Sequence, residues 1–158
     1  MSQDWNVGKL ALVGAVSGVI AGFVMIVLMM IVTAIAGQEF WATPKWIADA
    51  IYGSDWLGFN VQDVVTGLVI HFLLSIILGA VFGMIAVPLT SQPRQVLIFG
   101  LVWGILAWIL LTLLAMRAVD ETMAQQVPVV PWFVVHLIFG LILGYLVSSL
   151  RQVAAANA

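Results

Sequence analysis

The sequence contains no cysteine and has few charged side chains. Charged residues make up 8% of its 158 residues, whereas a soluble domain carries roughly 25%. Without a thiol, the chain can form no disulfide, thiolate metal site, iron–sulfur cluster or cysteine nucleophile. It also lacks a Ser/His/Asp order, an HExxH motif, a glycine-rich phosphate loop and a basic nucleic-acid patch. These absences predict a protein that is not an enzyme and binds no nucleic acid.

Charge is missing altogether from four long stretches of the chain, at residues 10–38, 64–93, 95–116 and 122–150. A helix needs about 20 mostly apolar residues to cross the hydrocarbon core of a bilayer, and each stretch supplies them. We therefore predict an all-α integral membrane protein, a bundle of four transmembrane helices in one transmembrane domain over residues 1–158. The predicted spans cover about 9–36, 63–87, 95–116 and 131–150.

A short helix is predicted between the first two spans, at residues 43–53. Thr43 is a typical N-cap, Pro44 suits the first helical position, and Gly53 suits a helix end. Asn60 is the predicted N-cap of the second span. Four apolar residues fall on one face of the short helix, which we expect to lie at the membrane interface. They are Trp46, Ile47, Ala50 and Ile51.

The chain contains an internal repeat of two helices, which predicts a parallel 2+2 arrangement of the spans. In the first and third spans, Gly14-x-Val16-x-Gly18-x-x-Ala21 matches Gly100-x-Val102-x-Gly104-x-x-Ala107. In the second and fourth, His71-x-x-x-Ser75-x-x-Leu78-Gly79 matches His136-x-x-x-Gly140-x-x-Leu143-Gly144. The chain has two histidines, and the match predicts that they occupy one register.

Small residues recur every four positions in each span, and such stripes let the backbones of membrane helices approach closely. We predict helix packing along Gly14, Gly18 and Gly22; Ser75, Gly79 and Gly83; Gly100 and Gly104; and Gly140, Gly144 and Ser148. In the second and fourth spans these stripes continue the line of the histidine. Both imidazoles should therefore point into the bundle. His71 follows Asp63, and His136 follows Pro128, by about 12 Å of helix, so similar heights are expected.

An ionisable residue inside a span indicates a functional site, and three interpretations of the histidines remain open. Each imidazole could be neutral and hydrogen-bonded across helices, to the other histidine or to Ser75, Thr66 or Thr112. His71 and His136 could instead ligate the metal of a haem b or a chlorin, with the glycines making room for a flat macrocycle. Finally, they could form a proton relay, although the spans contain no acid or base at depth to assist it.

Basic residues give a weak signal for orientation. With four spans, the N-terminus, the turn at 88–94 and the C-terminus share one side, which carries Lys9, Arg94 and Arg151. The other side carries Lys45 and Arg117. Because cytoplasmic loops are richer in basic residues, the bias favours cytoplasmic termini.

The chain resembles the YagU-like family, a group of uncharacterised four-span bacterial inner-membrane proteins. The resemblance rests on the run 67–75 around His71 with Gly79 and Gly83, on Gly100-x-x-x-Gly104, and on the run 136–145 around His136. A first span with Gly18-x-x-Ala21-Gly22-x-x-Met25 and a short helix after it also match. The resemblance implies a fold and a location in the bacterial cytoplasmic (inner) membrane, and it assigns no catalytic residue.

Small size, short loops and glycine-lined surfaces favour a non-enzymatic accessory or assembly subunit of a larger energy-converting membrane complex. Its expected partners are the lipid bilayer and other membrane subunits, or further copies of itself. The first alternative is a membrane protein that binds haem b or (bacterio)chlorophyll through His71 and His136. The second is a small proton-coupled transporter.

Overall fold

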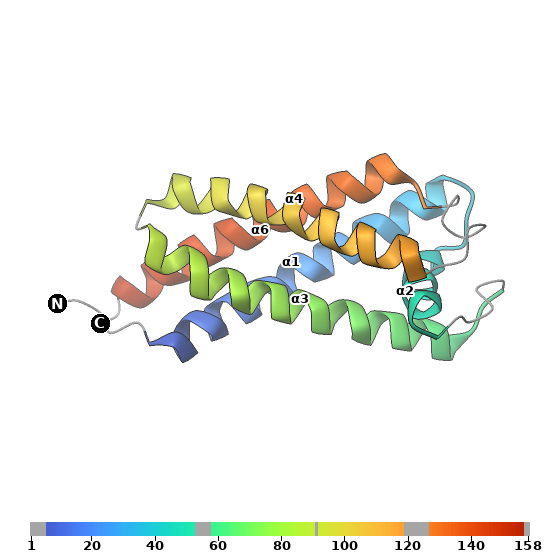
Figure 1. Cartoon of the computed structure of the whole chain (residues 1–158), viewed down its shortest axis with the longest axis horizontal. Helices are drawn as coiled ribbons and strands as arrows, with labels where there is room; N and C mark the ends of the chain where they lie inside the picture. The colour runs from blue at the N-terminus through green and yellow to red at the C-terminus, as the bar shows by residue number, and fades with distance from the viewer. Residues whose placement is uncertain (1–5, 53–57, 91, 119–126, 157–158) are drawn as a thin grey trace.

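The protein consists of long helices that run side by side, with one short helix across an end of the bundle (Figure 1). The computed structural model describes residues 6–52, 58–90, 92–118 and 127–156. Within them the helices are α1 (Val7–Ile35), α2 (Ala42–Tyr52), α3 (Val61–Leu89), α4 (Pro93–Ala118) and α6 (Val129–Ala156). Helices α1, α3, α4 and α6 are long and apolar enough to cross a membrane. The predicted all-α four-span architecture of a multi-pass membrane protein is confirmed.

The helices begin and end within a few residues of the predicted spans, except that α6 continues beyond 150. Asn60 caps α3 as expected, since its side-chain oxygen accepts a hydrogen bond from the backbone N–H of Gln62 at 2.9 Å. Asn6 caps α1 in the same way, through the N–H of Lys9 at 2.9 Å. Both caps satisfy N–H groups that a helix start leaves without a partner.

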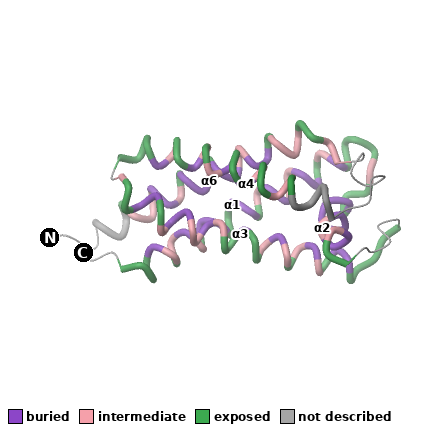
Figure 2. The backbone as a smooth tube through the Cα atoms, in the orientation of Figure 1, coloured by how far each residue is buried: buried purple, intermediate pink, exposed green. Residues whose placement is uncertain are grey.

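The long helices form two crossed hairpins. α1 packs closely on α3, and α4 packs closely on α6, while the hairpins meet mainly through α1 and α6. Contact between α3 and α4 is sparse, and Figure 1 shows these two helices in front of α1 and α6. The inward faces of the long helices are buried and their outward faces are exposed (Figure 2).

Helix α2 differs from its prediction in its start and in its surroundings. It begins at Ala42, so Thr43 lies inside the helix and is not its N-cap. Trp46 is 5% exposed and Ile51 is 66% exposed, so the predicted apolar face does not lie on lipid as one surface. The helix packs instead against the start of α3, where Gly67 has no side chain and lets the backbone of Pro44 approach.

Candidate functional site

The first hairpin is closed by backbone-to-backbone contact at the small residues. A Cβ atom added to Gly79 would lie 2.8 Å from the Cα of Gly18, and one added to Gly83 would lie 2.9 Å from the Cα of Gly14. Real Cβ atoms do not approach that closely, so glycine is required at both positions. Gly22 lies against the side chain of Ser75, one turn further along. Interhelical packing in membranes depends on such close approach.

The second hairpin is closed in the same way. A Cβ atom on Gly140 would lie 3.0 Å from the Cα of Gly104, and one on Gly144 would lie 2.8 Å from the carbonyl oxygen of Val96. Gly100 faces the backbone of Gly140. In both hairpins, therefore, the glycine stripe is filled by the backbone of the partner helix.

The two hairpins do not follow the sequence repeat in one register. In the sequence match Gly14 corresponds to Gly100, and Gly79 corresponds to Gly144. In the structure, however, Gly14 faces the backbone carbonyl of Gly79, whereas Gly100 faces that of Gly140. Gly140 precedes Gly144 by four residues. Relative to α4, α6 is therefore shifted by about one helical turn, roughly 5.4 Å, from the position that α3 has relative to α1.

The histidines are displaced by the same turn, which corrects the expectation that they share a register. Gly18 faces the carbonyl of Ser75 in the first hairpin, while its counterpart Gly104 faces the carbonyl of His136 in the second. Relative to the partner helix, His136 thus occupies the place of Ser75, and Trp132 occupies the place of His71. The repeat relates the helices as a pair of hairpins and does not make the histidine positions equivalent.

Both imidazoles are nevertheless buried, as expected. His71 is 8% exposed and His136 is 1% exposed.

His71 joins α3 to α1. Its Nε2 lies 2.9 Å from the carbonyl oxygen of Gly22, which can only accept, so Nε2–H donates. The hydroxyl of Ser75 donates to the backbone carbonyl of His71 at 2.8 Å. His71 thus makes the expected hydrogen bond across helices. Its acceptor is the main-chain carbonyl of Gly22, however, and not one of the side chains that the sequence suggested.

His136 is anchored within its own helix. Its Nδ1 lies 2.7 Å from the carbonyl oxygen of Trp132, and its ring packs edge-on against the Trp132 indole at 4.7 Å between centroids. The Trp132 indole in turn donates to the hydroxyl of Thr112 in α4 at 3.0 Å. The Nε2 atom of His136 is buried and has no hydrogen-bond partner. Thr112 therefore binds Trp132 rather than a histidine.

A tetrapyrrole held between the two histidines does not fit this geometry. A metal-ligating histidine donates one ring N–H to a carbonyl and ligates with the other nitrogen, an arrangement that the ring of His136 has. His71 likewise donates Nε2–H to the carbonyl of Gly22, which leaves its Nδ1 as the nitrogen that could ligate. The glycines that were expected to make room for a macrocycle face the backbone of a neighbouring helix. Within the described residues, no group of three or more His, Asp or Glu side chains could hold a metal ion.

A second buried polar region lies at the end of the bundle that α2 covers. Asp63 is 2% exposed, and its Oδ1 accepts a hydrogen bond from the Tyr52 hydroxyl at 2.5 Å. This bond raises the pKa of Tyr52 above its ordinary value of 10.0. Lys45 is also 2% exposed, and its Nζ donates to Glu39 at 2.7 Å and to the carbonyl of Gly58.

The spacing of residues along α3 is a sequence signal for this region. Asp63, Gly67, His71 and Ser75 are spaced four residues apart, so they lie along one face of α3. All four are buried. The line of small and polar residues drawn from His71 toward Gly83 also extends backward to Asp63. The hydrogen bond between Tyr52 and Asp63 joins α2 to α3. No sequence pattern predicts this pairing.

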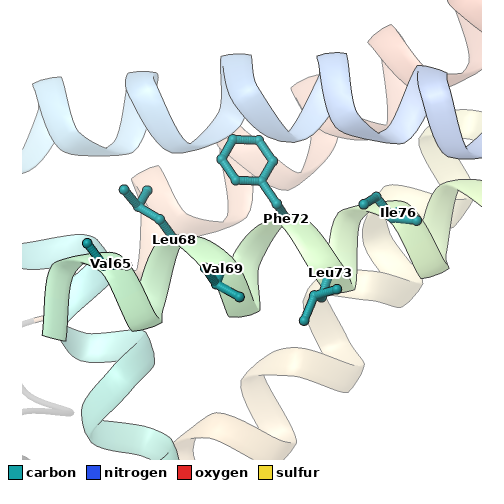
Figure 3. Close-up of a pocket in the computed structure, with 6 residues that line it drawn as sticks. All are labelled: Val65, Leu68, Val69, Phe72, Leu73 and Ile76. Carbon is teal, nitrogen blue, oxygen red and sulfur yellow. The ribbon is translucent and has the colours of Figure 1, made fainter. Parts of the chain in front are cut away.

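A shallow apolar groove of about 330 Å³ follows the outer surface of α3 (Figure 3). In Figure 3, Phe72 points toward α1 and Leu73 points away from it. The groove offers no polar group to a ligand. Its lining consists of Val65, Leu68, Val69, Phe72, Leu73 and Ile76.

Comparison with known proteins places the chain in a family. Residues 9–157 match the family of unknown function DUF6789, and the chain belongs to that family. No curated protein and no solved structure matches the chain. The family match supports a common fold along almost the whole chain and assigns no role to any residue.

Proposed function

We propose that the chain is a non-enzymatic accessory or assembly subunit of a larger complex in an energy-converting membrane. The observation that supports this proposal is the unequal covering of the four spans. The bundle buries 44% of the most apolar window of α1 and of α6, but only 28% of that of α3 and 22% of that of α4. Helices α3 and α4 therefore present broad apolar faces, on which neighbouring membrane subunits can pack.

The tight interior of each hairpin fits a subunit that acts through its surface. The backbones of α1 and α3 are in contact at Gly14, Gly18 and Gly79, and this close packing opposes sliding of α1 along α3. A rigid pair of hairpins keeps the outer faces of α3 and α4 in a constant arrangement. Large exposed side chains along them include Val69 and Leu73 on α3 and Leu106 on α4.

The proposal includes a location in the bacterial cytoplasmic (inner) membrane with both termini in the cytoplasm. Its support is the resemblance to the YagU-like family and the position of the basic residues. The start of α1, the end of α6, the end of α3 and the start of α4 gather at one end of the bundle (Figure 1). Lys9, Arg94 and Arg151 lie at that end. Because the cytoplasmic side of a membrane protein is richer in basic residues, we assign this end to the cytoplasm.

Site-specific photo-cross-linking in living cells tests the proposal. A photoreactive side chain at Leu73 or Leu106, on the outer faces of α3 and α4, should give one discrete adduct with an integral membrane protein of a complex. The same side chain at Leu12, which is 64% exposed on α1, is the matched control and should give lipid adducts. Lipid adducts alone at all three positions, together with a monomer in mild detergent, would remove the support for a subunit role.

The two alternatives have weaker support. A bis-histidine tetrapyrrole is disfavoured because the glycines that were expected to make room for it face the backbone of a neighbouring helix. A proton-coupled transporter is disfavoured because the buried polar residues on this face of α3 end at Ser75, beyond which α3 contacts α1 through Gly79 and Gly83. An absorbance spectrum of protein purified from its native membrane tests the first alternative, since a Soret band lost in both His71→Ala and His136→Ala would restore it. Proton flux into vesicles that depends on either histidine would restore the second.

A further inference from the structure

We propose that Lys9 and the exposed face of α1 below it bind an anionic phospholipid. The Lys9 ammonium pairs with the lipid phosphate, and an acyl chain lies along the exposed side chains of Leu12, Val16 and Val19. This role does not depend on the proposed subunit function, because it concerns α1 and not the outer faces of α3 and α4. It also holds for either orientation of the bundle in the membrane.

Charge is divided unequally between the two ends of the bundle. At one end, here called the basic end, α1 and α4 begin and α3 and α6 finish (Figure 1). Among the described residues this end carries no acidic side chain and three basic ones: Lys9, Arg94 and Arg151. The other end carries more acidic than basic side chains among the described residues: Glu39, Asp49 and Asp63 with Lys45 and Arg117. The basic end therefore has the charge that an anionic headgroup requires.

Lys9 is free to bind a headgroup, whereas Arg151 is already engaged. Arg151 donates to the carbonyls of Thr90 and Val87 at the end of α3. The side chain of Lys9 is exposed, and within the part of the chain that the structure describes it forms no ion pair or hydrogen bond. An exposed ammonium without a partner can pair with a phosphate at no cost to the contacts of the fold.

Below Lys9, exposed apolar side chains form a narrow strip along α1. Leu12, Val16 and Val19 follow Lys9 at steps of three or four residues, so they lie on one face. From Lys9 to Val19 the strip is about 15 Å long, half of the roughly 30 Å hydrocarbon core. The strip thus has the length of one leaflet. The bundle buries 44% of the most apolar window of α1 but only 22% of that of α4, so the face below Arg94 is broader and fits a single chain less well.

The position of Lys9 in its helix directs the ammonium toward the lipid phosphates. Lys9 lies in the first turn of α1, and the Cα–Cβ bonds of a helix tilt toward its start. The long stem of a lysine extends along apolar surface and keeps its charge at the membrane interface. Near an anionic membrane surface each basic side chain strengthens binding about fivefold. Lys9 and the strip together therefore match the two parts of an anionic phospholipid.

Fluorescence quenching by spin-labelled lipids tests the proposal with full-length protein in phosphatidylcholine vesicles. Because the chain contains no cysteine, a fluorophore attached to Leu12→Cys reports on the lipid beside Lys9. Spin-labelled phosphatidylglycerol should bind there about fivefold more tightly than spin-labelled phosphatidylcholine, and Lys9→Gln should remove this preference. A fluorophore at Ile31→Cys, which is 42% exposed near the other end of α1, should report no preference for the anionic lipid.

Arg94→Gln is the matched charge control, because Arg94 is exposed at the basic end but on α4. It should leave the preference at Leu12→Cys unchanged. Equal losses in Lys9→Gln and Arg94→Gln would indicate a diffuse surface potential and would overturn the site. A preference that persists in Lys9→Gln, or no preference at Leu12→Cys with Lys9 present, would overturn it too. Inorganic phosphate at constant ionic strength should not displace the spin-labelled lipid, and displacement would show that Lys9 binds a free anion and not a lipid.

Discussion

The Nε2 atom of His71 lies 2.9 Å from the carbonyl oxygen of Gly22, and this hydrogen bond joins the two helices of the first hairpin. The acceptor belongs to the main chain of α1 and reaches the ring because Gly22 has no side chain. His136 has no comparable bond, since its Nδ1 bonds within α6. One histidine thus fastens two helices, while the other stiffens a single helix.

Replacing His71 by leucine should therefore destabilise the protein more than replacing His136. Hydrogen bonds between membrane helices contribute on the order of 0.6–2 kcal/mol, and His71→Leu should lose about that much. His136→Leu should cost less, because it breaks a bond inside one helix and removes the buried unpaired Nε2. Unfolding of each variant by sodium dodecyl sulfate from mixed micelles measures the difference. Equal losses would contradict the distinct roles of the two rings.

Gly79 provides a steric test of the first hairpin. Its added Cβ would meet the backbone of Gly14 and Gly18, with the Cα of Gly18 at 2.8 Å. Gly79→Ala should therefore force α1 and α3 apart and lower the free energy of unfolding by about 1–3 kcal/mol. Gly8→Ala is the control, because its Cβ would meet only the Asn6 side chain at 3.4 Å. A Gly79→Ala protein as stable as Gly8→Ala would show that the backbones do not meet there.

The spans and their number could be predicted from the sequence, because hydrocarbon excludes charge and because its thickness fixes the length of a helix. The cap at Asn60 could also be predicted, since capping depends on neighbouring residues alone. Both signals depend on residues close together in the sequence. They therefore do not depend on how the helices pack against one another.

The register between the helices could not be predicted. Small residues every four positions offer the same groove after a shift of one turn, so Gly14 can face Gly79 or Ser75 with equal pattern agreement. Which of the two registers forms depends on how the contacting side chains and backbones of the two helices fit together. The polar contacts of α2 escaped prediction for a related reason, since Tyr52 meets Asp63 only after α2 folds back over α3.

The Tyr52 phenol should ionise at higher pH than a free tyrosine. Its hydrogen bond to Asp63 raises the pKa of Tyr52 above the ordinary value of 10.0, because the neutral hydroxyl is the donor. A raised pKa means that this bond stabilises the fold fully below pH about 10. The contribution is then lost as the pH rises through the higher pKa of the folded state.

An ultraviolet titration measures this shift when Tyr145→Phe leaves Tyr52 as the sole tyrosine. Asp63→Leu should move the midpoint back toward about 10, because leucine offers the phenol no hydrogen-bond acceptor. A midpoint that Asp63→Leu leaves in place would show that another group causes the shift.

Arg151 near the end of α6 should stabilise the end of α3. Its Nη1 donates to the carbonyl of Thr90 at 2.5 Å and to that of Val87 at 3.4 Å. The last carbonyls of a helix have no hydrogen-bond donor within it. The guanidinium of Arg151 provides that donor at the end of α3. Arg151→Met keeps much of the apolar stem but removes the donors, and it should cost about 1 kcal/mol because the group is only partly buried. Hydrogen exchange should accelerate in the last turn of α3.

Arg94→Met is the control for this substitution, because Arg94 is exposed at the start of α4 beside the same turn. It removes the same charge from the same end of the bundle without touching the α3 carbonyls. Faster exchange in both variants would indicate that net charge at this end matters, and not the hydrogen bonds. Faster exchange in Arg151→Met alone would tie the two hairpins together at the end opposite α2, where sparse contact between α3 and α4 leaves α6 to join them.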